Sequence, residues 1–151
     1  MNVSKIFVVA FLAGIASSAQ AQSLPPIVQQ AIAQARQECA SNVQLLPGFI
    51  SEKDINGDGR NDYILEYEKF HCGGGPTFCG SGGCTTQVFA SRPDGTYVKA
   101  LDDNVRGLRF TRVNGRPAML IGVHGSACGR SGAEACNMTL YWNGYSFSPA
   151  N

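Results

Sequence analysis

An internal repeat constrains the fold of this chain more than any other feature of its sequence. A turn, an apolar strand and a Cys-Gly pair begin at Gly59, and the same series begins again 56 residues later at Gly115. After a glycine-rich loop the offset becomes 52, so that Cys84 matches Cys136. Self-similarity of this kind indicates a supersecondary unit that occurs twice. The unit is a turn, a strand, a cysteine-bounded loop, a strand, a tight turn and a strand.

The repeat predicts the fold class. We expect a mainly β protein with two repeated antiparallel β units, packed as a small sandwich, an open barrel or a partial propeller. The first repeat covers residues 49–101 and the second covers residues 106–149. Apolar and polar residues alternate from Asp62 to Phe70, which is typical of a half-buried strand.

The N-terminal region divides into a leader and a helix. Lys5, an apolar run and a small-x-small site ending at Ala21 predict a secretory signal peptide over residues 1–21. Residues 22–151 then form a single domain. Its first part, residues 22–46, has apolar residues at helical spacing, and Ser23 is suited to cap the helix.

Charge and hydropathy exclude two classes of function. The sequence has 12 Lys and Arg and 11 Asp and Glu, and Lys5 of the leader is the one charged residue removed with it. The remaining chain has no net charge, which argues against a general nucleic-acid binder. No run after the leader reaches the ~20 apolar residues of a membrane span. We therefore expect a periplasmic or secreted protein without a membrane span.

Six cysteines follow the leader, and an even number in an exported chain predicts a disulfide framework. They are Cys39, Cys72, Cys79, Cys84, Cys128 and Cys136. Sequence alone allows 15 pairings of six cysteines. If each repeat closes the same loop, the pairs are Cys72–Cys84 and Cys128–Cys136. Cys39 then joins Cys79 and ties the helix to the longer loop.

An acidic loop lies at the start of the first repeat. Oxygen-bearing side chains occur at alternate positions in it, at Asp54, Asn56 and Asp58, and again at Asp62. Calcium takes six to eight oxygen ligands, and a tight loop supplies them from such positions together with a carbonyl. The sequence therefore favours a calcium site, and the alternative is a polar turn that binds nothing.

This loop, followed directly by Tyr63-Ile64-Leu65, resembles the calcium loops of FG-GAP and VCBS-type repeats. In those families such a loop precedes the first strand of a β-propeller blade and binds calcium. The resemblance implies four side-chain ligands and one carbonyl donor, namely Asp54, Asn56, Asp58, Asp62 and, through its carbonyl, Arg60. The second repeat has Asn114-Gly115 without acids, so we expect no metal there. Two units are also too few to close a propeller. The chain as a whole resembles exported bacterial proteins.

Two functions of different classes are compatible with the sequence. The first is a non-enzymatic binding or structural module, stabilised by calcium in the acidic loop, whose partner is an unidentified protein or glycan of the cell envelope. The alternative is a small secreted hydrolase or inhibitor that uses the glycine-rich cysteine loops near His71 and His124. Ser126 lies two residues after His124, a spacing at which strand side chains point the same way.

Overall fold

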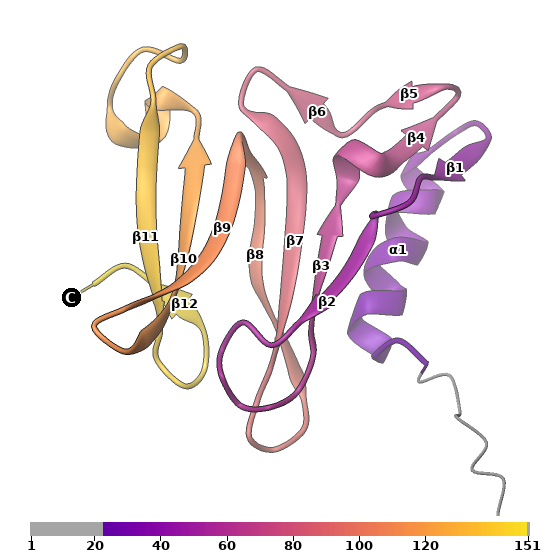
Figure 1. Cartoon of the computed structure of the whole chain (residues 1–151). Helices are drawn as coiled ribbons and strands as arrows, with labels where there is room; N and C mark the ends of the chain where they lie inside the picture. The colour runs from indigo at the N-terminus through magenta and orange to yellow at the C-terminus, as the bar shows by residue number, and fades with distance from the viewer. Residues whose placement is uncertain (1–22, 151) are drawn as a thin grey trace, which may run out of the picture.

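The computed structural model describes residues 23–150, which form one helix and twelve strands in three antiparallel sheets (Figure 1). The predicted signal peptide, residues 1–21, lies outside the described residues. The prediction of a mainly β protein with one N-terminal helix and three disulfides is confirmed. In chain order the elements are α1 (Pro26–Glu38), β1 (Val43–Leu45), β2 (Ile50–Lys53), β3 (Asp62–Glu66), β4 (Phe70–Cys72), β5 (Gly75–Pro76), β6 (Cys79–Gly80), β7 (Gly83–Ser91), β8 (Tyr97–Val105), β9 (Gly107–Val113), β10 (Arg116–Val123), β11 (Cys136–Trp142) and β12 (Phe147–Ser148).

The helix is shorter than the predicted 22–46. Its N-cap is Pro25 rather than Ser23, because Pro25 has an extended backbone and Pro26 suits the first turn, where no N–H is needed. It ends before Cys39, whose backbone is extended. The chain then enters β1, so Gln44 lies in a strand and not in the helix.

The strand predicted from Asp62 to Phe70 is broken into three parts. β3 ends at Glu66, a 3₁₀ turn covers Tyr67–Lys69, and β4 joins a different sheet. The break places both Tyr67 and Phe70 in the same buried aromatic cluster, which a continuous strand would not do. Local alternation in the sequence does not reveal this, because the cluster forms with residues far along the chain.

Two sheets contain most of the strands. In one, β2, β3, β7 and β8 lie side by side in chain order, and β6 also pairs with β7. In the other, β9, β10, β11 and β12 lie side by side. Asn114 and Gly115 join β9 to β10 with positive φ at both residues, as a two-residue type I′ hairpin requires. β1, β4 and β5 form a small third sheet beside the helix.

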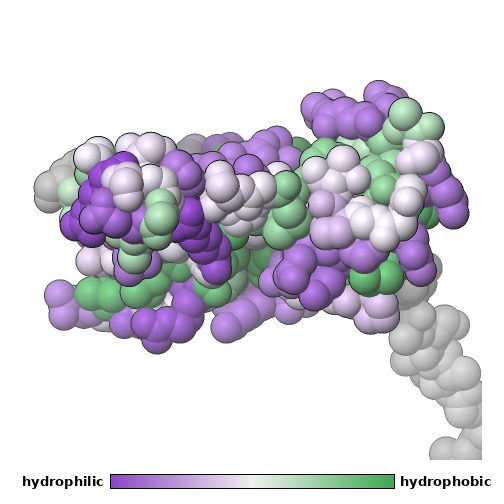
Figure 2. Space-filling view, turned by 90° about the horizontal axis from the view of Figure 1, so that it is seen from above, coloured by the Kyte–Doolittle hydropathy of each residue, from purple (hydrophilic) through white to green (hydrophobic). Residues whose placement is uncertain are grey.

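The β2-β3-β7-β8 sheet is the middle of three layers. One face packs against α1, whose Val28, Ala31 and Ala35 are buried in a cluster with Leu65 and Phe89. The other face packs against the β9–β12 sheet through a second apolar cluster. Coverage of both faces explains why four consecutive residues of β3, from Asp62 to Leu65, are buried. Seen from above, hydrophilic residues predominate, with smaller hydrophobic patches between them (Figure 2).

The disulfides correct two of the three predicted pairs. Cys128–Cys136 is confirmed, whereas the structure has Cys39–Cys72 and Cys79–Cys84, so the predictions Cys72–Cys84 and Cys39–Cys79 are wrong. The reason is strand pairing. β1 follows the helix, and its Val43 lies opposite Cys72 of β4, which brings Cys72 to Cys39 at the end of the helix. Cys79 lies opposite Cys84 in the β6–β7 pair. The longer loop of the first half thus contains hairpins of its own, which the repeat does not predict.

Candidate functional site

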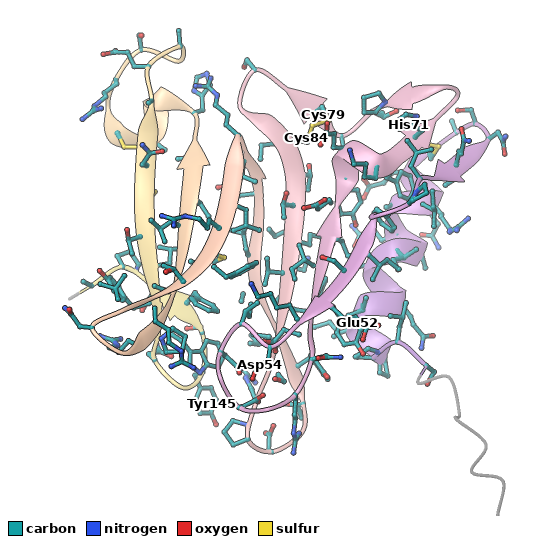
Figure 3. All side chains as sticks on the ribbon, viewed as in Figure 1. Glu52, Asp54, His71, Cys79, Cys84 and Tyr145 are labelled. Carbon is teal, nitrogen blue, oxygen red and sulfur yellow. A yellow bond between two sulfur atoms is a disulfide. The ribbon has the colours of Figure 1, made fainter. Side chains whose placement is uncertain are left out.

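The acidic loop connects β2 to β3 at one end of the molecule. The pair Lys53 and Asp62 closes it, so the loop lies between two strands rather than before a first strand. Figure 3 shows Asp54 on this loop, and His71 at the opposite end of the molecule. All five predicted ligand residues therefore belong to one local structure.

Side-chain oxygens of the loop accept hydrogen bonds from its own backbone. Asp54 accepts from the amides of Gly57 and Gly59 at 2.6 and 3.0 Å. Asn56 accepts from the Asp58 amide at 3.0 Å, and Asp58 accepts from the Arg60 amide at 2.8 Å. Both glycines have positive φ, which lets the loop bend twice without steric strain. These contacts shape the loop and turn its oxygens inward.

Asp62 anchors the loop to the end of β7. Its side chain is fully buried and accepts from the Ile55 amide at 2.7 Å and from the Ser91 amide at 2.6 Å. The Ser91 hydroxyl lies 2.7 Å from the same carboxylate. Burial raises the pKa of Asp62, the bonds from Ser91 and Ile55 oppose that rise, and the nearby Asp58 carboxylate adds to it.

Ser91 brings two carboxylates together and has one hydroxyl proton for both. Its Oγ lies 2.8 Å from Asp58 Oδ2 and 2.7 Å from Asp62 Oδ1, while Asn56 Nδ2 lies 2.8 Å from the Ser91 carbonyl oxygen. A hydroxyl donates one hydrogen bond, so one of the two carboxylate contacts needs a proton or a cation. Ser91 could not be predicted from the sequence, since a serine at the end of a strand carries no signal of this role.

Replacing Asp62 with Asn should lower the free energy of unfolding by about 1–3 kcal/mol, because the new amide leaves a buried donor facing the Ile55 N–H. The raised pKa lets the folded chain keep a proton that the unfolded chain has lost. The contribution of the Asp62 side chain to the free energy of unfolding is therefore greatest below the ordinary pKa of an Asp. It falls as the pH rises through the pKa that Asp62 has in the folded chain. Urea unfolding in the presence of EDTA measures the free energy of unfolding of wild type and variant. The difference between the two values should become smaller as the pH rises from about 4 to 7. A constant or widening difference would contradict this account.

Two arginines bring positive charge to the loop, Arg112 from the other sheet and Arg60 from the loop itself. A Cβ placed on Gly57 would lie 2.5 Å from Nη2 of Arg112, and one placed on Gly95 would lie 3.1 Å from Nη1 of Arg60. Arg112 comes from β9 of the other sheet and donates to the Gly115 carbonyl at 3.1 Å. The guanidinium of Arg112 thus reaches the acidic loop from the other sheet, and its positive charge partly offsets that of the carboxylates.

The loop carries carboxylate, amide and carbonyl oxygens, the ligand types that a hard cation prefers. Within residues 23–150 no three His, Cys, Asp or Glu side chains are arranged to hold a metal ion. The pair of carboxylates at Ser91 is supplemented by neutral oxygens, which calcium accepts as ligands. A carboxylate has about four lone-pair sites, so the bonds to backbone amides leave capacity for a cation. Coordination by Asp54, Asn56, Asp58, Asp62 and the Arg60 carbonyl stays a prediction.

One histidine lies on a strand and the other in a loop of a different part of the fold, and they form no common site. His71 lies on β4. His124 caps a 3₁₀ turn, Gly125–Cys128, in the β10–β11 loop, and its Nδ1 lies 2.7 Å from Ser126 Oγ. A Cβ on Gly132 would overlap the other edge of the imidazole. The Ser–His contact therefore shapes the end of a turn.

No helix in the part of the chain that the structure describes is both long and apolar enough to cross a membrane. Comparisons of the chain with protein-family models, with curated proteins and with solved structures found no match.

Proposed function

We propose that this chain is an exported, non-enzymatic binding or structural module in which a calcium ion stabilises the loop from Asp54 to Asp62. The observation that carries the proposal is the single Ser91 hydroxyl shared by two carboxylates. A divalent cation at this point removes the repulsion between Asp58 and Asp62 and fixes the loop to the end of β7. Its role is then structural, since it joins segments that are about thirty residues apart.

The surface beside the loop supports a role in binding. Tyr145 is 65% exposed, and among residues 23–150 it is the one large hydrophobic residue that is exposed. The Arg92 guanidinium lies 4.8 Å from the centre of its ring. An aromatic ring held in this way offers a flat apolar contact to a protein or a glycan. We propose a partner of this kind in the cell envelope.

The disulfides and the sheet order support the remaining parts of the proposal. Three disulfides persist in an oxidising compartment, which supports a periplasmic or secreted location. In each of the two larger sheets four strands lie side by side in chain order, β2-β3-β7-β8 and β9-β10-β11-β12, which supports an internal repeat. The acids occur in the first copy only, and the second has the bare turn at Asn114-Gly115. The turn then serves the fold, and calcium binding is an addition to one copy.

Calcium should raise the melting temperature of the protein, and EDTA should lower it to the value of the metal-free form. A free calcium concentration of 100 times Kd would add about 2.7 kcal/mol, because the ion binds only the folded form. Asp58→Ala should abolish the calcium response measured by differential scanning calorimetry. Glu68→Gln, which removes an exposed carboxylate paired with Lys69, should keep it. The proposal fails if neither EDTA nor Asp58→Ala changes the melting temperature.

A secreted hydrolase or inhibitor is the second candidate, and the contact between His124 and Ser126 is the observation in its favour. In a Ser–His pair that hydrolyses esters or amides, the second ring nitrogen is oriented by an acid. Here that edge of the ring faces Gly132. His71 lies on β4 of the small third sheet, whereas the pair lies in the β10–β11 loop, so His71 adds nothing to the pair. We therefore favour the binding module over hydrolysis as the function of this chain.

A further inference from the structure

A groove of about 230 Å³ runs between α1 and the edge of the middle sheet formed by β7 and β8. Its floor is the buried Tyr67 with Ala31 and Ala35 of the helix, and Phe78 forms one end. One wall carries Gln34 and Glu38 from the helix. The opposite wall carries Gln87 and Asp102 from the sheet. The groove is separate from the acidic loop, which lies between β2 and β3.

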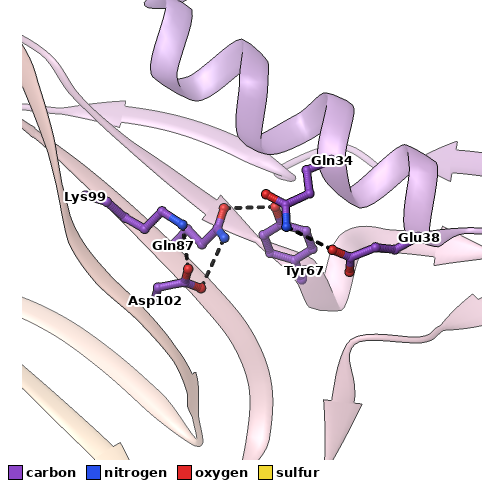
Figure 4. Close-up of polar contacts among 6 residues, drawn as sticks. All are labelled: Gln34, Glu38, Tyr67, Gln87, Lys99 and Asp102. Atoms are coloured by element: carbon purple, nitrogen blue, oxygen red, sulfur yellow. Dashed lines mark hydrogen bonds and ion pairs between the residues drawn. The ribbon is translucent and has the colours of Figure 1, made fainter.

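A directed chain of hydrogen bonds fixes the sheet wall (Figure 4). The Tyr67 hydroxyl donates to Gln87 Oε1 at 2.9 Å, and Gln87 Nε2 donates to Asp102 Oδ1 at 3.1 Å. The other oxygen of Asp102 lies 2.6 Å from Lys99 Nζ. Each donor in this series of hydrogen bonds lies on the side of the floor, and each acceptor lies toward Asp102. The floor hydroxyl and the Gln87 amide are thereby held in one orientation.

The helix wall adds a second carboxylate. Gln34 Nε2 donates to Glu38 Oε1 at 3.1 Å, which holds Glu38 over the groove (Figure 4). Within residues 23–150 the ion pairs are Lys69–Glu68 and Lys99–Asp102, and neither includes Glu38. Of the two carboxylates that line the groove, Asp102 is thus paired with an ammonium, and Glu38 takes part in no ion pair among the described residues. The pKa of Tyr67 is raised to about 12, first by burial and then by Asp102 and Glu38, so the negative potential reaches the floor.

The groove combines three features that suit one ligand chemistry. Carboxylates on opposite walls attract a cation and accept its hydrogen bonds. The half-buried Phe78 lines the groove, and an aromatic ring attracts an ammonium group placed over its face. The methyl groups of Ala31 and Ala35 suit an alkyl stem. We propose that this groove binds a primary alkylammonium group, carried either by a free diamine or by the lysine side chain of a partner polypeptide.

Titration with 1,5-diaminopentane and with N-acetyl-lysine-methylamide, followed by amide chemical shifts of the full chain after leader removal, tests the site. We expect shifts at Tyr67 and Gln87 and at the Gln34 side-chain amide. Glu38→Gln should weaken binding at least tenfold. Asp103→Asn should leave it unchanged, because its side chain lines a different pocket, on the side of His124. The fully Nε-acetylated lysine analogue should not bind.

The two probes separate the sources of the ligand. Tighter binding of the diamine indicates a free amine, and tighter binding of the lysine derivative indicates a polypeptide partner. Absence of shifts at millimolar concentration, equal binding of the acetylated analogue, or unchanged affinity in Glu38→Gln would overturn the proposal. The calcium response of the melting temperature is independent of these results, so the two proposals stand or fall separately.

Discussion

Phe70→Ala should lower the free energy of unfolding by about 3–5 kcal/mol, as deletion of a fully buried aromatic side chain does. Phe70 has no exposed surface. Its ring centre lies 5.4 Å from those of Phe49 and Phe78 and 5.7 Å from that of Tyr67. The same cluster contains the buried face of α1, so the deletion weakens the packing of the helix on the middle sheet. Urea unfolding followed by far-ultraviolet circular dichroism measures the loss.

Tyr145→Ala is the matched control, because it also deletes an aromatic ring but at a position that is 65% exposed. We expect a change of about 1 kcal/mol or less, the value of an exposed cation–π contact with Arg92. If Phe70→Ala costs no more than Tyr145→Ala, the helix does not depend on this cluster. Comparison of the two variants thus separates helix docking from a general effect of ring deletion.

Local sequence signals predicted those parts of the fold that depend on local physics. The two-residue turn at Asn114 and Gly115 has the positive φ values that these residues favour. The apolar stripe of the helix faces the core, as its spacing predicts. Cys128 lies within the β10–β11 loop and Cys136 begins the strand that follows it, so their pairing is also local.

Contacts between distant segments were not predictable from these signals. The pairing of β1 with β4 involves three residues of each strand, and such a short pair has no distinctive pattern. That pairing decides the partner of Cys39. Ser91 approaches Asp62 from 29 residues away, and only the register of β3 with β7 brings them together. The predicted ligand residues were found on one loop, but the residue that draws two of them together was missed.

Replacing both Cys39 and Cys72 with Ser should lower the free energy of unfolding by about 4 kcal/mol, the largest effect among the three disulfides. The stabilisation comes mainly from restricting the unfolded chain and grows with the logarithm of the loop that is closed. This pair closes 33 residues, whereas Cys128–Cys136 closes 8 and Cys79–Cys84 closes 5. The same relation gives about 2.5 and about 2 kcal/mol for the two shorter loops.

Equilibrium unfolding of the three double variants, compared in one buffer, tests this order and the pairing together. The Cys39–Cys72 bond joins the end of the helix to β4, close to Phe70, so its removal should loosen α1 before the rest of the fold. Hydrogen exchange of the α1 amides should then become faster by a larger factor than that of the β10 amides. An equal loss in all three variants would show that loop length does not control the effect. In the single variant Cys39→Ser, the former partner of Cys39 becomes a free thiol, which peptide mapping can locate. A free thiol at Cys79 instead of Cys72 would contradict the Cys39–Cys72 pairing.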